Sequence, residues 1–252
     1  MFWSHHQPHG PTAASFEGNL DLAAFVREAQ ANSLLVLLRI GPYCDAETDF
    51  GALPGWLLHQ KVREIRTNQT QFVGLVRSWW ERYLFPVVRP LLFSNGGPVV
   101  MVQIENEFGA FSSGTAADSD YMQQLVGMVR SGLGPSILLY TTDGDRLPEM
   151  ARGSLKGSRV YSVPDFGPGG LLCAATCWYA AATGVLLLVC YYCWCATAGV
   201  LLLYYWCVWT RNHAVTGDPD FGGREEITAA FEAQRVMNLP GLCPLMCSEL
   251  YV

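Results

Sequence analysis

Long runs of apolar residues, bounded by glycine or proline, are the first pattern along the chain. Residues 34–40 (LLVLLRI) and 98–104 (PVVMVQI) are almost continuously apolar. An uninterrupted run of this length predicts a strand buried on both faces, as in a parallel sheet covered by helices. Shorter runs at 136–140, 160–163 and 244–248 predict three further strands.

Between these runs, apolar residues recur every three or four positions, which is the spacing of a helix with one buried face. The segments that show this spacing are residues 19–32, 71–83, 121–133 and 225–238. Trp79 and Trp80 belong to one of them, and their spacing favours the core over a sugar-binding platform. Strands that alternate with helices predict an α/β fold with a parallel sheet and crossover helices.

Two of the predicted strands end in carboxylates, in Glu107 after residues 98–104 and in Glu249 after residues 244–248. Parallel strands present their carboxyl ends on the same face of a sheet, so these two side chains are expected to emerge together. A facing pair of carboxylates can break a glycosidic bond, one as proton donor and the other as nucleophile or base. The alternative is that both are solvated charges at the start of loops.

Composition narrows the classes of function. The chain has 252 residues, half of them hydrophobic, a net charge of −6 and 16 lysines and arginines. These basic residues do not cluster, so we expect no nucleic-acid partner. The first residues, MFWSHHQPHG, lack the charged and then apolar pattern of a signal peptide.

Cysteine and histidine raise the question of a metal site. Of the nine cysteines, only Cys44, Cys243 and Cys247 lie outside residues 173–207. The trio at 190, 193 and 195 lacks a second matching ligand pair and lies in an apolar run, which disfavours zinc. A second alternative is a site made by the histidines at 5, 6 and 9. We expect neither a metal nor a cofactor.

Six segments resemble a known enzyme family. They are FWSHHQP (2–8), FEGNLDLAAFV (16–26), LLVLLRIGPYCDAETDFGALPGWLL (34–58), NGGPVVMVQIENEFG (95–109), LLYTTDG (138–144) and PLMCSELY (244–251). In this order they resemble glycoside hydrolase family 35, the β-galactosidases. The resemblance implies a (β/α)8 TIM barrel with retaining chemistry, and the α/β pattern read from the residues agrees with it.

The resemblance also implies roles for individual residues. Glu107 matches the acid/base and Glu249 the nucleophile. Asn106 is expected to hydrogen-bond the 2-hydroxyl of the sugar, and Glu47 to contact the galactose hydroxyls. Tyr251 matches a tyrosine beside the nucleophile.

The chain departs from the family pattern at several positions. Asp45 stands where a cysteine that lines the galactose pocket is usual, and Thr48 replaces a tryptophan. Asp45 is therefore expected to line the sugar site. Glu105 matches a motif position with an expected structural role, hydrogen-bonding its neighbours beneath the site. The barrel is expected to be incomplete, with its first and eighth strands missing.

Residues 164–218 are expected to be an insertion between the sixth strand and its helix, dividing barrel segments 1–163 and 219–252. The sequence PDFG recurs at 164–167 and 219–222, and residues 171–210 contain no charged residue or histidine. An apolar stretch of this length favours either a membrane hairpin or a segment foreign to the fold over a buried structural element. A membrane is therefore a partner only through residues 171–210.

Two functions remain open at this stage. The first is a retaining glycoside hydrolase that releases terminal β-D-galactose from galactosides or glycans. The second is a non-catalytic barrel fragment that binds sugar weakly or is inactive. The family resemblance favours a vacuolar, lysosomal or extracellular location.

Overall fold

The computed structural model describes residues 1–144, 146–155, 158–165 and 187–189. The backbone forms two compact units. The first holds Met1–Asn106, Asp120–Leu138 and residues 187–189, and the second holds Glu107–Ser119 and the described part of 139–165. Each unit contains parallel strands joined by helices, so the predicted α/β class is confirmed.

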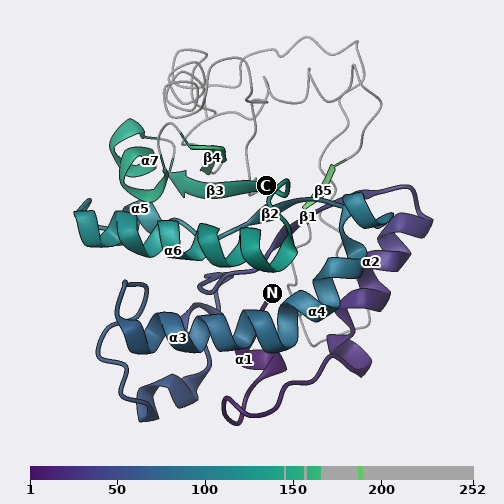
Figure 1. Cartoon of the computed structure of the whole chain (residues 1–252), viewed down its shortest axis with the longest axis horizontal. Helices are drawn as coiled ribbons and strands as arrows, with labels where there is room; N and C mark the ends of the chain where they lie inside the picture. The colour runs from purple at the N-terminus through teal and green to yellow at the C-terminus, as the bar shows by residue number, and fades with distance from the viewer. Residues whose placement is uncertain (145, 156–157, 166–186, 190–252) are drawn as a thin grey trace, which may run out of the picture. The chain divides into compact units, whose positions relative to one another are not determined.

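The two long apolar runs form neighbouring parallel strands of the first unit, β1 (Leu35–Arg39) and β2 (Val99–Gln103) (Figure 1). Their register places Arg39 opposite Gln103 at the carboxyl ends. Gly97 leads into β2 where a side chain would overlap the backbone of the preceding turn, so only glycine fits there. Both predicted strands are confirmed.

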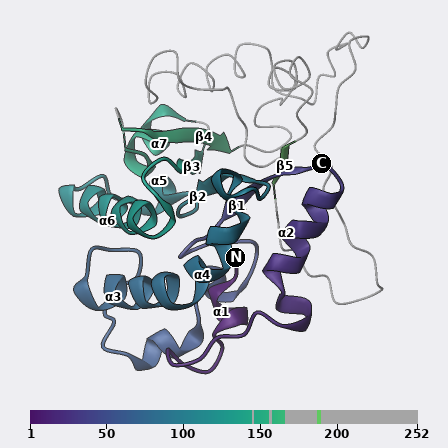
Figure 2. The same ribbon diagram turned by 45° about the vertical axis from the view of Figure 1, so that its right-hand side comes forward.

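Helix α2 (Leu22–Ala31) precedes β1 and packs beside it (Figure 2). Its first turn is capped by Asp21, whose Oδ1 accepts the backbone N–H of Ala24 at 2.8 Å. Such a cap contributes about 1 kcal/mol. The face turned inward carries Leu22, Val26 and Ala29. The helix predicted at 19–32 is confirmed, with its start set by the aspartate.

The helix predicted at 71–83 is longer than expected. α3 (Thr70–Trp79) continues through the π-helical turn η4 (Trp80–Leu84) into α4 (Phe85–Val88). Pro86 has no N–H to donate and would break an α-helix interior. It is tolerated because it lies in the first turn of α4, after a widened turn in which the Phe85 N–H reaches the carbonyl of Trp80.

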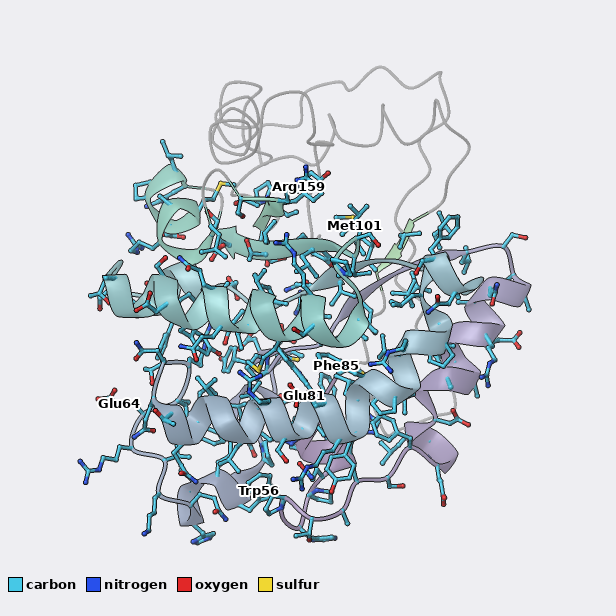
Figure 3. The ribbon with its side chains drawn as sticks, viewed as in Figure 1. Trp56, Glu64, Glu81, Phe85, Met101 and Arg159 are labelled. Atoms are coloured by element: carbon cyan, nitrogen blue, oxygen red, sulfur yellow. The ribbon has the colours of Figure 1, made fainter. Side chains whose placement is uncertain are left out.

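Aromatic rings fill the core around α3. Trp79 is 1 % exposed and stacks on Trp3, with centroids 6.0 Å apart, and Trp80 is fully buried. Trp56, labelled in Figure 3, meets Trp3 edge-on, and its indole N–H donates to the carbonyl of Gln7 at 2.7 Å. The core position expected for Trp79 and Trp80 is confirmed. Short helices complete this unit: α1 (Trp3–His6), η1 (Gly18–Leu20), η2 (Asp49–Ala52), η3 (Gly55–His59), η5 (Arg89–Leu91) and η6 (Phe93–Asn95).

The second unit is built on the parallel strands β3 (Leu138–Gly144) and β4 (Val160–Asp165). The ranges predicted for them, 136–140 and 160–163, missed both carboxyl ends. The reason is that β3 continues through polar residues that are nonetheless buried, Thr141, Thr142 and Asp143. The short helix α5 (Phe108–Phe111) precedes both strands in sequence, and α7 (Leu147–Gly153), which was not predicted, lies between them.

Helix α6 (Ala116–Leu133) begins five residues before the predicted start at 121. Its first five residues, AADSD, include no large apolar side chain, so hydrophobic spacing does not reveal them. The start is set by a capping box: the Asp118 carboxylate accepts the Thr115 N–H at 2.8 Å, and the Thr115 hydroxyl accepts the Asp118 N–H at 3.3 Å. The pattern of threonine and acid three positions apart was the available signal.

Five residues of the expected insertion are described, Pro164 and Asp165 at the end of β4 and Leu187–Val189. The last three form β5 (Leu187–Val189), which pairs in parallel with β1 in the first unit. The rest of residues 171–210, and the predicted elements at 225–238 and 244–248, lie outside the described residues. Among the helices that the structure describes, none has both the length and the apolar character of a bilayer span.

Candidate active site

The candidate site begins where β2 ends, at Glu105, Asn106 and Glu107. Glu105 and Glu107 have left-handed backbone conformations, with φ of 60° and 46°. Such conformations cost about 1–3 kcal/mol each outside glycine and persist only where surrounding contacts hold them. The chain turns sharply here, so that Glu105 and Asn106 are buried while Glu107 is only half-buried.

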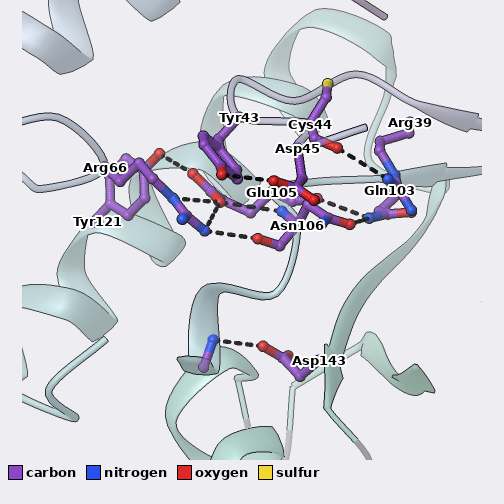
Figure 4. Close-up of polar contacts among 11 residues, drawn as sticks. Arg39, Tyr43, Cys44, Asp45, Arg66, Gln103, Glu105, Asn106, Tyr121 and Asp143 are labelled. Atoms are coloured by element: carbon purple, nitrogen blue, oxygen red, sulfur yellow. Dashed lines mark hydrogen bonds and ion pairs between the residues drawn. The ribbon is translucent and has the colours of Figure 1, made fainter. Parts of the chain in front are cut away.

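Glu105 is the centre of a buried polar network in the first unit (Figure 4). Its Oε2 accepts the Arg66 guanidinium at 2.8 Å, and its Oε1 accepts the Tyr121 hydroxyl at 2.6 Å. Burial, reinforced by the Glu105 charge, raises the pKa of Tyr121 well above its usual value. Tyr121 therefore stays protonated and acts as a donor. The hydrogen-bonding expected of Glu105 is confirmed.

Asn106 is held at three atoms. Its backbone N–H donates to Glu105 Oε2 at 3.1 Å, and its carbonyl accepts from Arg66 Nη2 at 2.7 Å. Its side-chain Oδ1 accepts from Gln103 Nε2 at 3.2 Å. Because backbone and side chain are fixed together, Asn106 has one orientation, which is what a binding residue requires.

Asp45 joins the same network through Tyr43. The Tyr43 hydroxyl donates to Asp45 Oδ1 at 2.9 Å, and the Arg66 guanidinium lies 3.9 Å from the centre of the Tyr43 ring. Burial and the Asp45 hydrogen bond raise the pKa of Tyr43 to about 12. Since Arg66 also holds Asn106, the structure links Asp45 and Asn106 by two intermediate side chains.

The loop that carries Asp45 is conformationally strained. Asp45, Ala46 and Glu47 have φ of 57°, 55° and 47°, three consecutive non-glycine residues in the left-handed region. The Glu47 side chain is exposed on this loop. A side chain at Gly51 would overlap the Tyr43 ring. The ring therefore packs directly against the backbone of Gly51, across the loop that carries Asp45.

Glu107 is the first residue of the second unit, and its backbone N–H contacts a buried residue there. Its backbone N–H donates to the carbonyl of Thr142 at 2.8 Å, at the carboxyl end of β3. Two residues later, the Gly109 N–H donates to Asp143 Oδ1 at 2.6 Å (Figure 4). Arg152 Nε donates to the Gly109 carbonyl at 2.9 Å. These bonds fix the backbone that carries Glu107 at the start of α5.

The structure accounts for only part of the predicted site. Asp45 and Asn106 belong to one network, Glu47 is exposed on the Asp45 loop, and Glu107 is half-buried at the start of the second unit. Glu249 and Tyr251 lie outside the described residues. Sequence reasoning missed the supporting side chains, namely Arg39, Arg66, Gln103, Tyr121 and Asp143. Arg39 and Gln103 each interrupt an apolar run, LLVLLRI and PVVMVQI. A polar side chain in a strand expected to be buried was the signal that could have identified them.

The histidine alternative has a structural explanation without a metal. His6 is buried, its Nδ1 donates to the Ser15 carbonyl at 2.8 Å, and its ring stacks on Phe16. Burial lowers its pKa to about 4, so the ring is neutral near pH 7. Within the described part of the chain, no group of three or more histidine, cysteine or acidic side chains is placed to hold a metal ion.

Comparison with known proteins finds relatives that match about two thirds of the chain. The chain is 44% identical to Beta-galactosidase 17 of Arabidopsis thaliana over 168 residues, which cover 66% of this chain and 23% of the relative. It is 44% identical to the Beta-galactosidase-1-like protein of Mus musculus over 167 residues, 66% of this chain and 24% of that protein. It is 40% identical to the Beta-galactosidase of Bos taurus over 173 residues, 69% and 25% of the two chains. It thus spans about a quarter of the length of these curated relatives.

Strand β2 of this α/β fold ends in Glu105, Asn106 and Glu107, at the edge of the sheet where parallel α/β folds place their active sites. The family described as Glycosyl hydrolases family 35 matches residues 1–182, more than half of the sequence, and the chain therefore belongs to glycoside hydrolase family 35.

Proposed function

We propose that this chain has the activity of a retaining β-galactosidase, releasing terminal β-D-galactose from galactosides or galactose-containing glycans. The observation that carries the proposal is the position of Glu107. It follows a buried strand, its backbone is hydrogen-bonded to Thr142, and it comes directly after the clamped Asn106. Relatives named beta-galactosidases share this part of the sequence.

In the proposed reaction, the carboxylate of Glu249 attacks the anomeric carbon while Glu107 donates its proton to the departing glycosidic oxygen. Water then attacks the galactosyl ester as Glu107 takes a proton back, which restores both groups. Retention of this kind requires the two carboxyl groups to lie about 5–5.5 Å apart.

The remaining site residues bind the sugar in this proposal. Asn106 donates to the 2-hydroxyl beside the bond that breaks, a contact that strengthens in the transition state. Glu47, Asp45 and Tyr251 contact the other galactose hydroxyls or line their pocket. The link from Asp45 to Asn106 through Tyr43 and Arg66 supports a shared sugar-binding role for Asp45 and Asn106.

The architecture that goes with this function is a (β/α)8 barrel carried by residues 1–163 and 219–252, with residues 164–218 inserted. Parallel strand pairs in both described units and the family match support it. In such barrels the residues at the carboxyl ends of the strands form the active site, which agrees with the positions of Glu107 and Asn106.

Glu107→Gln tests the proposal. Galactosides with poor leaving groups, such as alkyl galactosides, need a proton donor, so their kcat should fall by about 10²–10⁴-fold. Activated aryl galactosides should lose far less in bond cleavage, because their leaving groups depart without protonation. Azide, which needs no general base, should restore turnover of the aryl substrate and yield a β-galactosyl azide.

The matched control is Glu64→Gln, the same chemical change at an exposed position. It should leave kcat for both substrates unchanged. An equal loss on alkyl and aryl galactosides in Glu107→Gln would remove Glu107 from the acid role, and a wild-type chain inactive on both would refute the proposed function.

A further inference from the structure

Three buried side chains form a relay that ends at Asn106. Arg39 Nε donates to Gln103 Oε1 at 3.0 Å, and Gln103 Nε2 donates to Asn106 Oδ1 at 3.2 Å (Figure 4). The same Gln103 nitrogen donates to the Glu105 carbonyl at 2.9 Å, while Arg39 Nη1 donates to the Cys44 carbonyl at 3.1 Å. Arg39 is 5 % exposed and Gln103 is fully buried.

The orientation of the Gln103 amide is fixed by its partners on both sides. A guanidinium can only donate hydrogen bonds, so the Gln103 atom facing Arg39 must be the oxygen. A backbone carbonyl can only accept, so the atom facing the Glu105 carbonyl must be the nitrogen. The two neighbours therefore require the same amide orientation, and the register of β1 and β2 places Arg39 and Gln103 side by side.

This orientation determines that of Asn106. The Gln103 nitrogen presents a hydrogen to Asn106, so the Asn106 atom facing it must be the acceptor Oδ1. The reversed Asn106 amide would bring two N–H groups together. The Nδ2 group of Asn106 is therefore directed away from Gln103.

We infer that Arg39 and Gln103 are positioning residues that make Asn106 a hydrogen-bond donor to substrate. The inference rests on the proposed function and deepens it. A site whose asparagine offers N–H groups selects a galactoside whose hydroxyl oxygen, next to the reacting carbon, accepts a hydrogen bond. In this inference Arg39 and Gln103 act on the reaction through Asn106 and do not touch the sugar.

The main test is Gln103→Glu in the full chain. The new carboxylate still accepts from Arg39 but cannot donate, so Asn106 should reverse and donate its Nδ2 hydrogen to it. For an aryl β-galactoside, kcat should fall about 10–100-fold, the size of one hydrogen bond lost in the transition state, with a smaller change in KM. The 2-deoxygalactoside, which lacks the accepting hydroxyl, should be hydrolysed as fast as by the wild type.

Asn106→Asp is the second variant. It keeps an oxygen for Gln103 but removes the donors, so it should show the same loss, confined to the substrate that has the hydroxyl. Gln71→Glu, the same chemical change on the exposed side of α3, should alter neither substrate. Equal losses on both galactosides in the two site variants, or an undiminished preference for the 2-hydroxyl in Asn106→Asp, would overturn the inference.

A spectroscopic measurement separates this inference from the proposed function. In a chain labelled with ¹⁵N at asparagine side chains, the Asn106 signal is identified by its loss in Asn106→Asp. In Gln103→Glu one Nδ2 proton should move strongly downfield, because it forms a shorter, charge-assisted hydrogen bond. An unmoved Asn106 signal overturns the relay. If the wild type hydrolyses no galactoside, the proposed function fails while this signal still decides how Asn106 is oriented.

Discussion

Glu105 and Glu81 each pair with an arginine, and the two pairs differ in how much water reaches them. The Arg66–Glu105 pair is 2.8 Å long with side chains only 6% and 1% exposed. The Arg77–Glu81 pair is 3.2 Å long, lies one helical turn apart, and is 49% and 46% exposed. Removing one partner of a buried pair leaves a charge without compensation, whereas an exposed charge is solvated by water.

We therefore expect Glu105→Gln to destabilise the protein much more than Glu81→Gln does. The first should lower the free energy of unfolding by about 3–5 kcal/mol, because Arg66 remains charged in a buried site. The second should cost less than about 1 kcal/mol. Urea unfolding of the wild type and both variants measures this difference. Equal shifts in the two midpoints would show that the Glu105 network does not hold the end of β2.

At the scale of the element, helix α6 contains two glycines in contrasting surroundings. An added Cβ at Gly127 meets nothing within 4 Å, whereas one at Gly132 would overlap the ring of Phe85. The carbonyl of Gly132 also accepts Arg89 Nη2 at 2.6 Å. Gly132 thus lets α6 approach the start of α4 closely, while Gly127 only weakens the helix.

The matched substitutions Gly127→Ala and Gly132→Ala should therefore change stability in opposite directions. Alanine at 127 should stabilise the protein by up to about 1 kcal/mol, because glycine is the poorer helix former. Alanine at 132 should destabilise it by about 1–3 kcal/mol, because Phe85 or the helix must shift. Thermal unfolding of both variants provides the measurement. If both substitutions stabilised the protein, the contact between α4 and α6 would accommodate an extra methyl group without a loss of stability.

Across the whole molecule, sequence patterns predicted what hydrophobicity determines. The runs at 34–40 and 98–104 became β1 and β2, and the tryptophans of α3 are core residues. The pattern failed where polar residues are buried, as in β3, and where a polar capping box sets the start of α6.

The candidate site was predicted only in part for the same reason. The motif around Asn106 and Glu107 is visible in the sequence, but its support is not. Arg39 and Gln103 are 64 positions apart, and Arg66 reaches Glu105 from another loop. Such contacts follow from strand register and loop path, which hydrophobic periodicity does not encode.

The proposed retaining β-galactosidase activity is tested by the anomer of galactose that the chain releases. An aryl β-galactoside is incubated with the full chain, and the anomeric proton of the free galactose is followed by NMR from the first minutes. Two successive displacements at the anomeric carbon should give β-galactose first, with α-galactose appearing only as the sugar equilibrates in water. Initial release of α-galactose, or no release of galactose at all, would contradict the account.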